Sequence, residues 1–123
     1  MLQALLAISI ATAWTPIPRG SDWLPGGQLV REARRQLNQA VLAEAKLAGK
    51  LDQLPSWSTY SFQYQGRVVE GRRMIYVNAY CTPPPAYAKT EFVRVLDGGP
   101  CYFFALYDVA SKRYAAVVFN GRG

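Results

Sequence analysis

Residues 60–81 read YSFQYQGRVVEGRRMIYVNAYC and contain two strand patterns in succession. Aromatic and polar side chains alternate from Tyr60 to Gln65, and a second β-rich run extends from Arg72 to Cys81. Glu70-Gly71 separates the two runs as a turn. Because a period of two places successive side chains on opposite faces of a strand, this stretch predicts two consecutive antiparallel strands.

The residues on either side of these strands set the fold class. Residues 28–51 contain no proline, and their apolar side chains recur at spacings of three and four, as on one face of a helix. Three further strand patterns follow, at 91–96, 101–109 and 114–119. We therefore expect an α+β fold in which one long N-terminal helix packs on a curved antiparallel sheet of four or five strands. The nearest common architecture is a cystatin-like roll, an analogy of shape that carries no activity.

The N-terminal residues do not fit into this domain. Residues 1–13 read MLQALLAISIATA, an uncharged, mostly apolar run, shorter than the roughly 20 residues that span a bilayer. They predict a cleaved signal peptide and a periplasmic or secreted protein, although no basic residue precedes the run; an intact helix or short anchor is the alternative. Residues 14–27 contain three prolines and three glycines and predict a linker or strap. Residues 28–123 then form a single α+β domain.

Composition excludes several kinds of chemistry. The chain has 123 residues, two cysteines and no histidine, with 14 Lys and Arg against 8 Asp and Glu. Without histidine there is no Ser-His or Cys-His pair and no His-ligated zinc, and two cysteines cannot fill a zinc or iron-sulfur site alone. We expect no metal and no cofactor. The net charge of +6 favours anionic partners.

The two cysteines constrain the topology. In an exported protein, Cys81 and Cys101 predict a disulfide. A plain meander would place them at opposite rims of the sheet, about 26 Å apart, whereas a disulfide needs Cα atoms about 5 to 6 Å apart. If residues 82–90, with three successive prolines, double back over about 30 Å, the cysteines meet at one rim. Two buried thiols, or a redox role without a C-x-x-C motif, are the alternatives.

Strand alternation sorts the side chains into two faces. Ile75, Val77, Ala79 and Cys81 share one face and are predicted to lie against the helix. The other face combines aromatic rings with arginines and one asparagine, a composition typical of recognition surfaces. Its candidate binding residues are Arg72, Tyr76, Asn78, Tyr80, Phe92, Arg94, Tyr102 and Phe104. The alternative is that residues 14–25 or another subunit cover this face as a second core.

Two other functions stay open. A small hydrolase would need a carboxylate pair, and the available groups are Glu70, Glu91, Asp97 and Asp108. A nucleic-acid or anionic-polymer binder would need its arginines on one surface, and export removes nucleic acid as the usual target. The arginines in question are Arg31, Arg35, Arg67, Arg72 and Arg94.

The C-terminal half resembles a family of small exported bacterial proteins with no assigned activity. The resemblance rests on 72–81 (RRMIYVNAYC), on 97–104 (DGGPCYFF) continuing to Tyr107-Asp108, and on 119–121 (FNG). It implies an exported domain with Cys81 bonded to Cys101, and it supplies no catalytic residue. We therefore predict a non-enzymatic binding module, such as an inhibitor or a cell-envelope accessory protein, whose partner is a protein or an anionic envelope polymer.

Overall fold

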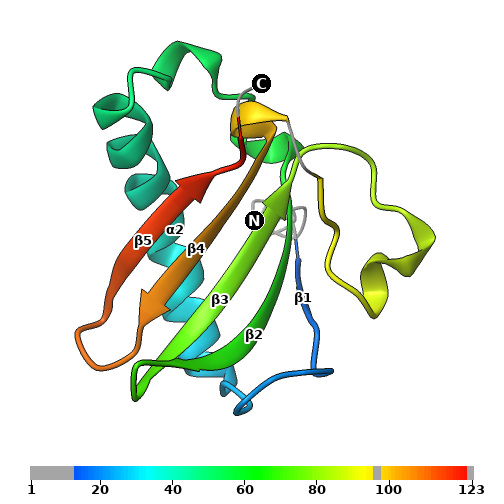
Figure 1. Ribbon diagram of the computed structural model, residues 1–123, viewed down its shortest axis with the longest axis vertical. Helices are drawn as coiled ribbons and strands as arrows, with labels where there is room; N and C mark the ends of the chain where they lie inside the picture. Colours follow the sequence, from blue (N-terminus) through cyan, green and yellow to red (C-terminus); the bar gives the residue numbers. More distant parts are fainter. Residues whose placement is uncertain (1–12, 96–97, 122–123) are drawn as a thin grey trace, which may run out of the picture.

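The computed structural model describes residues 13–95 and 98–121, which form one long helix packed on an open five-stranded sheet (Figure 1). In chain order the helix and strands are β1 (Trp14–Pro16), α2 (Gly27–Leu47), β2 (Ser61–Val69), β3 (Arg72–Tyr80), β4 (Tyr102–Asp108) and β5 (Arg113–Phe119). Short 3₁₀ turns lie in the connections: η1 (Leu51–Gln53), η2 (Trp57–Thr59), η3 (Ala86–Lys89) and η4 (Gly99–Cys101). The predicted α+β class is confirmed.

The strands lie in sequence order across the sheet, and neighbours pair antiparallel from β2 to β5. β1 instead pairs parallel with β2, so that the sheet is mixed. The linker predicted at 14–27 therefore begins with an edge strand. Pro16 fits there because an edge strand leaves one side of its backbone without ladder hydrogen bonds. The predicted signal segment 1–13 lies, apart from Ala13, outside the described residues.

The strand predicted at 91–96 is wrong. Residues 91–95 form no strand, and Leu96 lies outside the described residues. The Val93 N–H donates to Gln63 Oε1, and the Val93 carbonyl accepts from Asn78 Nδ2, each at 2.9 Å. Side chains therefore satisfy the backbone groups that a strand would pair with a neighbouring strand.

Helix α2 begins after Gly26 and ends at Leu47, four residues earlier than its apolar pattern suggests. Gly49 adopts a φ of +71°, which an L side chain adopts only under strain. The Gly49 and Lys50 N–H groups donate to the carbonyls of Lys46 and Ala45, so that the helix closes in a Schellman motif. Among the described residues, no helix has both the length and the apolarity to cross a membrane.

The core lies between α2 and the sheet. One stripe of the helix, Ala33, Leu37, Val41 and Ala45, is fully buried. Its first three residues pack in one cluster with strand residues that include Ile75, Val77 and Ala79, as alternation predicts for β3. Tyr60 belongs to this cluster, and burial raises the pKa of its phenol to about 12.

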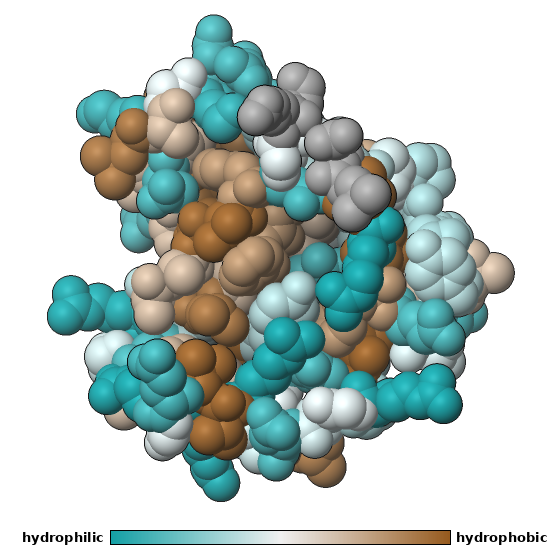
Figure 2. Space-filling view, viewed as in Figure 1, coloured by the Kyte–Doolittle hydropathy of each residue, from teal (hydrophilic) through white to brown (hydrophobic). Residues whose placement is uncertain are grey.

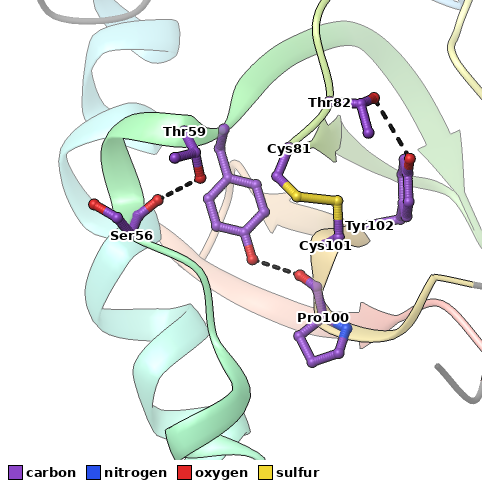
Figure 3. Close-up of a disulfide and its surroundings, with 8 residues drawn as sticks. Ser56, Thr59, Cys81, Thr82, Pro100, Cys101 and Tyr102 are labelled. Atoms are coloured by element: carbon purple, nitrogen blue, oxygen red, sulfur yellow. Dashed lines mark hydrogen bonds between the residues drawn. A yellow bond between two sulfur atoms is a disulfide. The ribbon is translucent and has the colours of Figure 1, made fainter.

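The predicted disulfide is present (Figure 3). Cys81 follows β3 and Cys101 precedes β4, and because these strands pair with Tyr80 opposite Tyr102, the two cysteine Cα atoms lie 5.1 Å apart. The Tyr60 hydroxyl donates to the Pro100 carbonyl beside the bridge. The chain does double back between the cysteines, and residues 82–95, which we call the arm, lie beside the sheet on one side of the molecule (Figure 1).

Candidate functional site

The candidate site lies on the outer face of the sheet, which is the face opposite α2. The strand register places on this face alternate residues of β2 to β5, beginning with Gln63 on β2, Asn78 on β3, Phe104 on β4 and Val118 on β5. In Figure 2, which views the molecule from the same direction as Figure 1, apolar side chains gather on this face over β4 and β5. The half formed by β2 and β3 is covered by the arm and by residues 14–26, which we call the N-terminal segment.

Gln63 fastens the arm to the sheet. Its side chain is fully buried, and its Nε2 donates to the carbonyls of Ala88 at 2.8 Å and Glu91 at 2.7 Å. Its Oε1 accepts from the backbone N–H of Val93 and from Asn78 Nδ2, each at 2.9 Å. All four hydrogen-bonding positions of one amide are thus filled, and the arm has a fixed position on the outer face.

Gln65, two residues further along β2, holds the N-terminal segment in the same way. Its Nε2 donates to the carbonyls of Ile17 at 3.0 Å and Arg19 at 3.1 Å. Its Oε1 accepts from Arg67 Nε at 2.7 Å. Two of the three polar residues that alternate with aromatic residues at the start of β2, Gln63 and Gln65, are therefore buried anchors.

Arg67 lies between the arm and the Gln65 side chain that holds the N-terminal segment. Its guanidinium carbon lies 3.7 Å from the centroid of the Tyr76 ring and 5.8 Å from that of Phe92. The Tyr76 ring also stacks on Phe104, with centroids 5.6 Å apart, and meets Phe92 edge to face at 5.2 Å. Cation-π and aromatic contacts of this kind fix the arm residue Phe92 over β3.

A pocket of about 260 Å³ remains between the end of the arm and the strands β3, β4 and β5. We call it the outer pocket. The Asn120 Nδ2 donates to the Val95 carbonyl and ties the end of β5 to the arm. The outer pocket is lined by Tyr76, Asn78, Val93, Arg94, Val95, Tyr102, Phe103, Phe104, Val118, Phe119 and Asn120.

The outer pocket combines apolar walls with a few polar groups. Arg94 is the one charged residue among the described residues that line it. Both hydrogen bonds of Asn78 use its Nδ2, so in the described part of the chain its Oδ1 has no protein partner. A cation at the rim and an amide oxygen inside suit an apolar group that carries a carboxylate and a hydrogen-bond donor.

Five of the eight candidate residues line the outer pocket, namely Tyr76, Asn78, Arg94, Tyr102 and Phe104. Phe92 lies next to it against Tyr76. Tyr80 is 3% exposed beneath the arm, where it packs with Ala88 and Val93, and burial raises the pKa of its phenol.

Arg72 lies apart from the pocket, near the other end of the sheet. Its Nε donates to Asp108 Oδ2 at 3.1 Å, and its Nη2 contacts the same oxygen. The Arg72 hydrogen bonds hold the pKa of the Asp108 carboxyl below its usual range, assisted by the Ala110 N–H. The charge of Arg72 is therefore already engaged within the protein.

The groups proposed for the two alternative functions are spread over the structure. Asp108 is engaged by Arg72, Glu70 lies in the turn between β2 and β3, Glu91 lies on the arm, and Asp97 lies outside the described residues. Arg31 and Arg35 belong to α2, on the opposite side of the sheet from Arg67 and Arg94. Within 13–95 and 98–121, no three Cys, Asp or Glu side chains gather as a metal site would require.

Sequence reasoning missed the residues that build the site around these candidates. Gln63 anchors the arm and Gln65 anchors the N-terminal segment, while Val118 of β5 and Asn120, which follows β5, complete the pocket. Alternation of polar and aromatic residues does not by itself indicate that the two glutamines are buried. One sequence signal could have indicated their burial. Gln63 and Gln65 lie on the same face of the sheet as Tyr76 and Asn78, the candidate binding residues of the neighbouring strand.

Comparisons with protein-family models, with curated proteins and with solved structures found no match for the chain. The fold itself defines the class: a disulfide-bonded α+β domain with one helix on a mixed, open sheet. The resemblance to a family of exported bacterial proteins stays a prediction.

Proposed function

We propose that this chain is an exported, non-enzymatic binding module that receives an apolar, carboxylate-bearing group of a partner in the outer pocket. The observation that carries the proposal is the pocket itself, which is walled by aromatic and aliphatic side chains and has Arg94 as its charged residue among those described. Phe104, Tyr102 and Val118 supply contact area, and the Asn78 amide oxygen supplies a polar contact for orientation.

The surrounding structure supports a pocket that is formed before the partner arrives. Gln63 fixes the arm through four hydrogen bonds, the disulfide joins the strands from which the arm leaves and to which the chain returns, and Asn120 ties its end to β5. A preformed site binds without the entropic penalty of ordering a loop. This favours recognition by a rigid surface.

The pocket is tested with two matched small probes, 3-phenylpropionate and its neutral amide, added to ¹⁵N-labelled protein. We expect both to shift the backbone amide signals of Asn78, Phe104 and Val118. Arg94→Gln should weaken the binding of the carboxylate probe by up to about fivefold, which is the range of an exposed ion pair. The affinity for the amide probe should stay unchanged. Arg31→Gln, on the far side of the molecule, is the matched control. Shifts that avoid the pocket residues would refute the proposal.

Export is a separate part of the proposal. The disulfide supports it, because such bonds persist in oxidising compartments. The intact mass of protein from a cell-envelope fraction, with and without reductant, tests it directly. We expect a chain that begins at Trp14 and gains two hydrogens on reduction. A full-length chain with free thiols would contradict export.

A further inference from the structure

Besides the outer pocket, the unpaired edge of β5 is a surface that another chain could bind. The sheet is open, and β5 has a neighbouring strand on one side only among the described residues (Figure 1). β5 is seven residues long, from Arg113 to Phe119, and contains no proline. The opposite edge strand, β1, is three residues long, ends on Pro16 and continues into the segment that Gln65 holds. Short, proline-bearing edges resist further pairing, and long regular ones invite it.

The register shows which backbone groups face outward. The Asn120 N–H donates to the Tyr102 carbonyl of β4. Because successive residues of an antiparallel strand point their N–H and C=O groups to alternate sides, those of Phe119 and Val117 point away from β4. In the described part of the chain, no hydrogen bond beyond the strand ladder reaches either residue.

The outer face beside this edge is apolar. Val118 is 43% exposed, and Ala116, Leu106 and Phe104 are half-buried next to it. Val118 and Phe119 also belong to the lining of the outer pocket, so the edge and the pocket form one continuous surface. A strand added to β5 would therefore place alternate side chains on this apolar area and its end beside the pocket.

Charge argues for one kind of occupant. Lys112 precedes the strand and Arg113 begins it, Arg94 lies at the pocket beyond its other end, and residues 114–119 carry no charge. An apolar segment flanked by acidic residues matches this arrangement. A second copy does not, because each chain brings a formal charge of +6.

We propose that β5 binds an extended, apolar segment of a partner protein, flanked by acidic residues, as a sixth strand of the sheet. The proposal rests on the proposed function and adds the form in which the partner binds. Backbone hydrogen bonds from Val117 and Phe119 would give affinity, and the apolar area and flanking cations would select the sequence.

The experiment uses the full chain and a nine-residue acetylated peptide, with aspartate at both ends and alternating valine and threonine between them. Amide hydrogen exchange is followed by NMR. We expect exchange at Val117 and Phe119 to slow at least about tenfold at saturation. Ala116 and Val118 should change little, because their amides already face β4. Arg113→Gln should weaken binding, with Arg31→Gln as its control.

Two peptide controls separate the possible causes. A version methylated on alternate backbone nitrogens cannot pair as a strand and should lose the protection of Val117 and Phe119. A version with lysine at both ends should bind more weakly. Peptide shifts confined to the outer pocket, without slower exchange at these amides, would overturn strand addition and leave the proposed function standing. A dimer in which the edge amides are protected without peptide would overturn it in favour of a second copy.

Discussion

At the scale of single residues, Gly66 decides how closely the N-terminal segment approaches the sheet. A β-carbon built on Gly66 would lie 2.2 Å from the Trp23 carbonyl oxygen and 2.9 Å from two atoms of the Trp23 indole. The indole N–H donates to the Arg67 carbonyl at 3.1 Å, and the Arg73 guanidinium lies over the ring. The indole therefore has little freedom to move aside.

We expect Gly66→Ala to lower the free energy of unfolding by about 2 to 3 kcal/mol, because backbone and a half-buried, hydrogen-bonded ring must both shift. Gly26→Ala is the matched control, since open space surrounds Gly26, and it should cost less than about 1 kcal/mol. Urea unfolding measures both variants. Equal losses in the two would contradict the account of the Trp23 contact.

Asp108 contributes to stability in a way that depends on pH and is lost in acid. Its carboxyl has a lowered pKa in the folded state, chiefly because Arg72 donates hydrogen bonds to it. A lowered folded pKa stabilises the protein above the unfolded pKa of about 3.9, and this contribution is lost as pH falls through the folded pKa. We expect Asp108→Asn to be less stable than wild type by a constant amount from pH 5 to 7. The difference should shrink below pH 4. Chemical unfolding across pH 2 to 7 measures it, and a difference that grows on acidification would contradict this.

At the scale of elements, helix α2 follows its sequence period only as far as Gly49. Ala33, Leu37 and Val41 are buried as their spacing predicts, whereas Leu51, which follows Gly49, is 47% exposed. The left-handed turn at Gly49 redirects the chain. A periodicity argument assumes a continuous helix, so it fails beyond the residue where the backbone changes direction.

The arm is the element whose position depends most on one side chain. Removal of the Gln63 amide leaves two carbonyls and two N–H donors without their partner. We expect Gln63→Ala to cost about 3 kcal/mol or more, at about 1 to 3 kcal/mol for each buried group left unsatisfied. Exchange of the Val93 amide should accelerate by more than the global loss of stability explains. Gln39→Ala, exposed on α2, is the control and should change neither quantity.

At the scale of the whole molecule, the disulfide closes a loop between residues 20 apart and holds the base of the arm. Loop-closure entropy gives such a bridge about 3 kcal/mol of stability. The double variant Cys81→Ser with Cys101→Ser should lose about this amount in urea unfolding. Wild type unfolded in the presence of a reductant should show the same loss. A double variant as stable as the oxidised wild type would contradict this role.

The sequence by itself determined the fold class, the helix, the four main strands and the meeting of the two cysteines. These follow from local rules: side-chain periodicity fixes which face of β3 is buried, and disulfide geometry requires the cysteine ends of β3 and β4 to meet at one rim of the sheet. The sequence also identified five of the residues that line the outer pocket. Tertiary structure alone decided that residues 14–16 form a strand, that the arm forms none, and that Gln63 and Gln65 are buried. Those outcomes depend on hydrogen bonds between residues that lie from 15 to 48 positions apart in the chain, which no local pattern of side chains encodes.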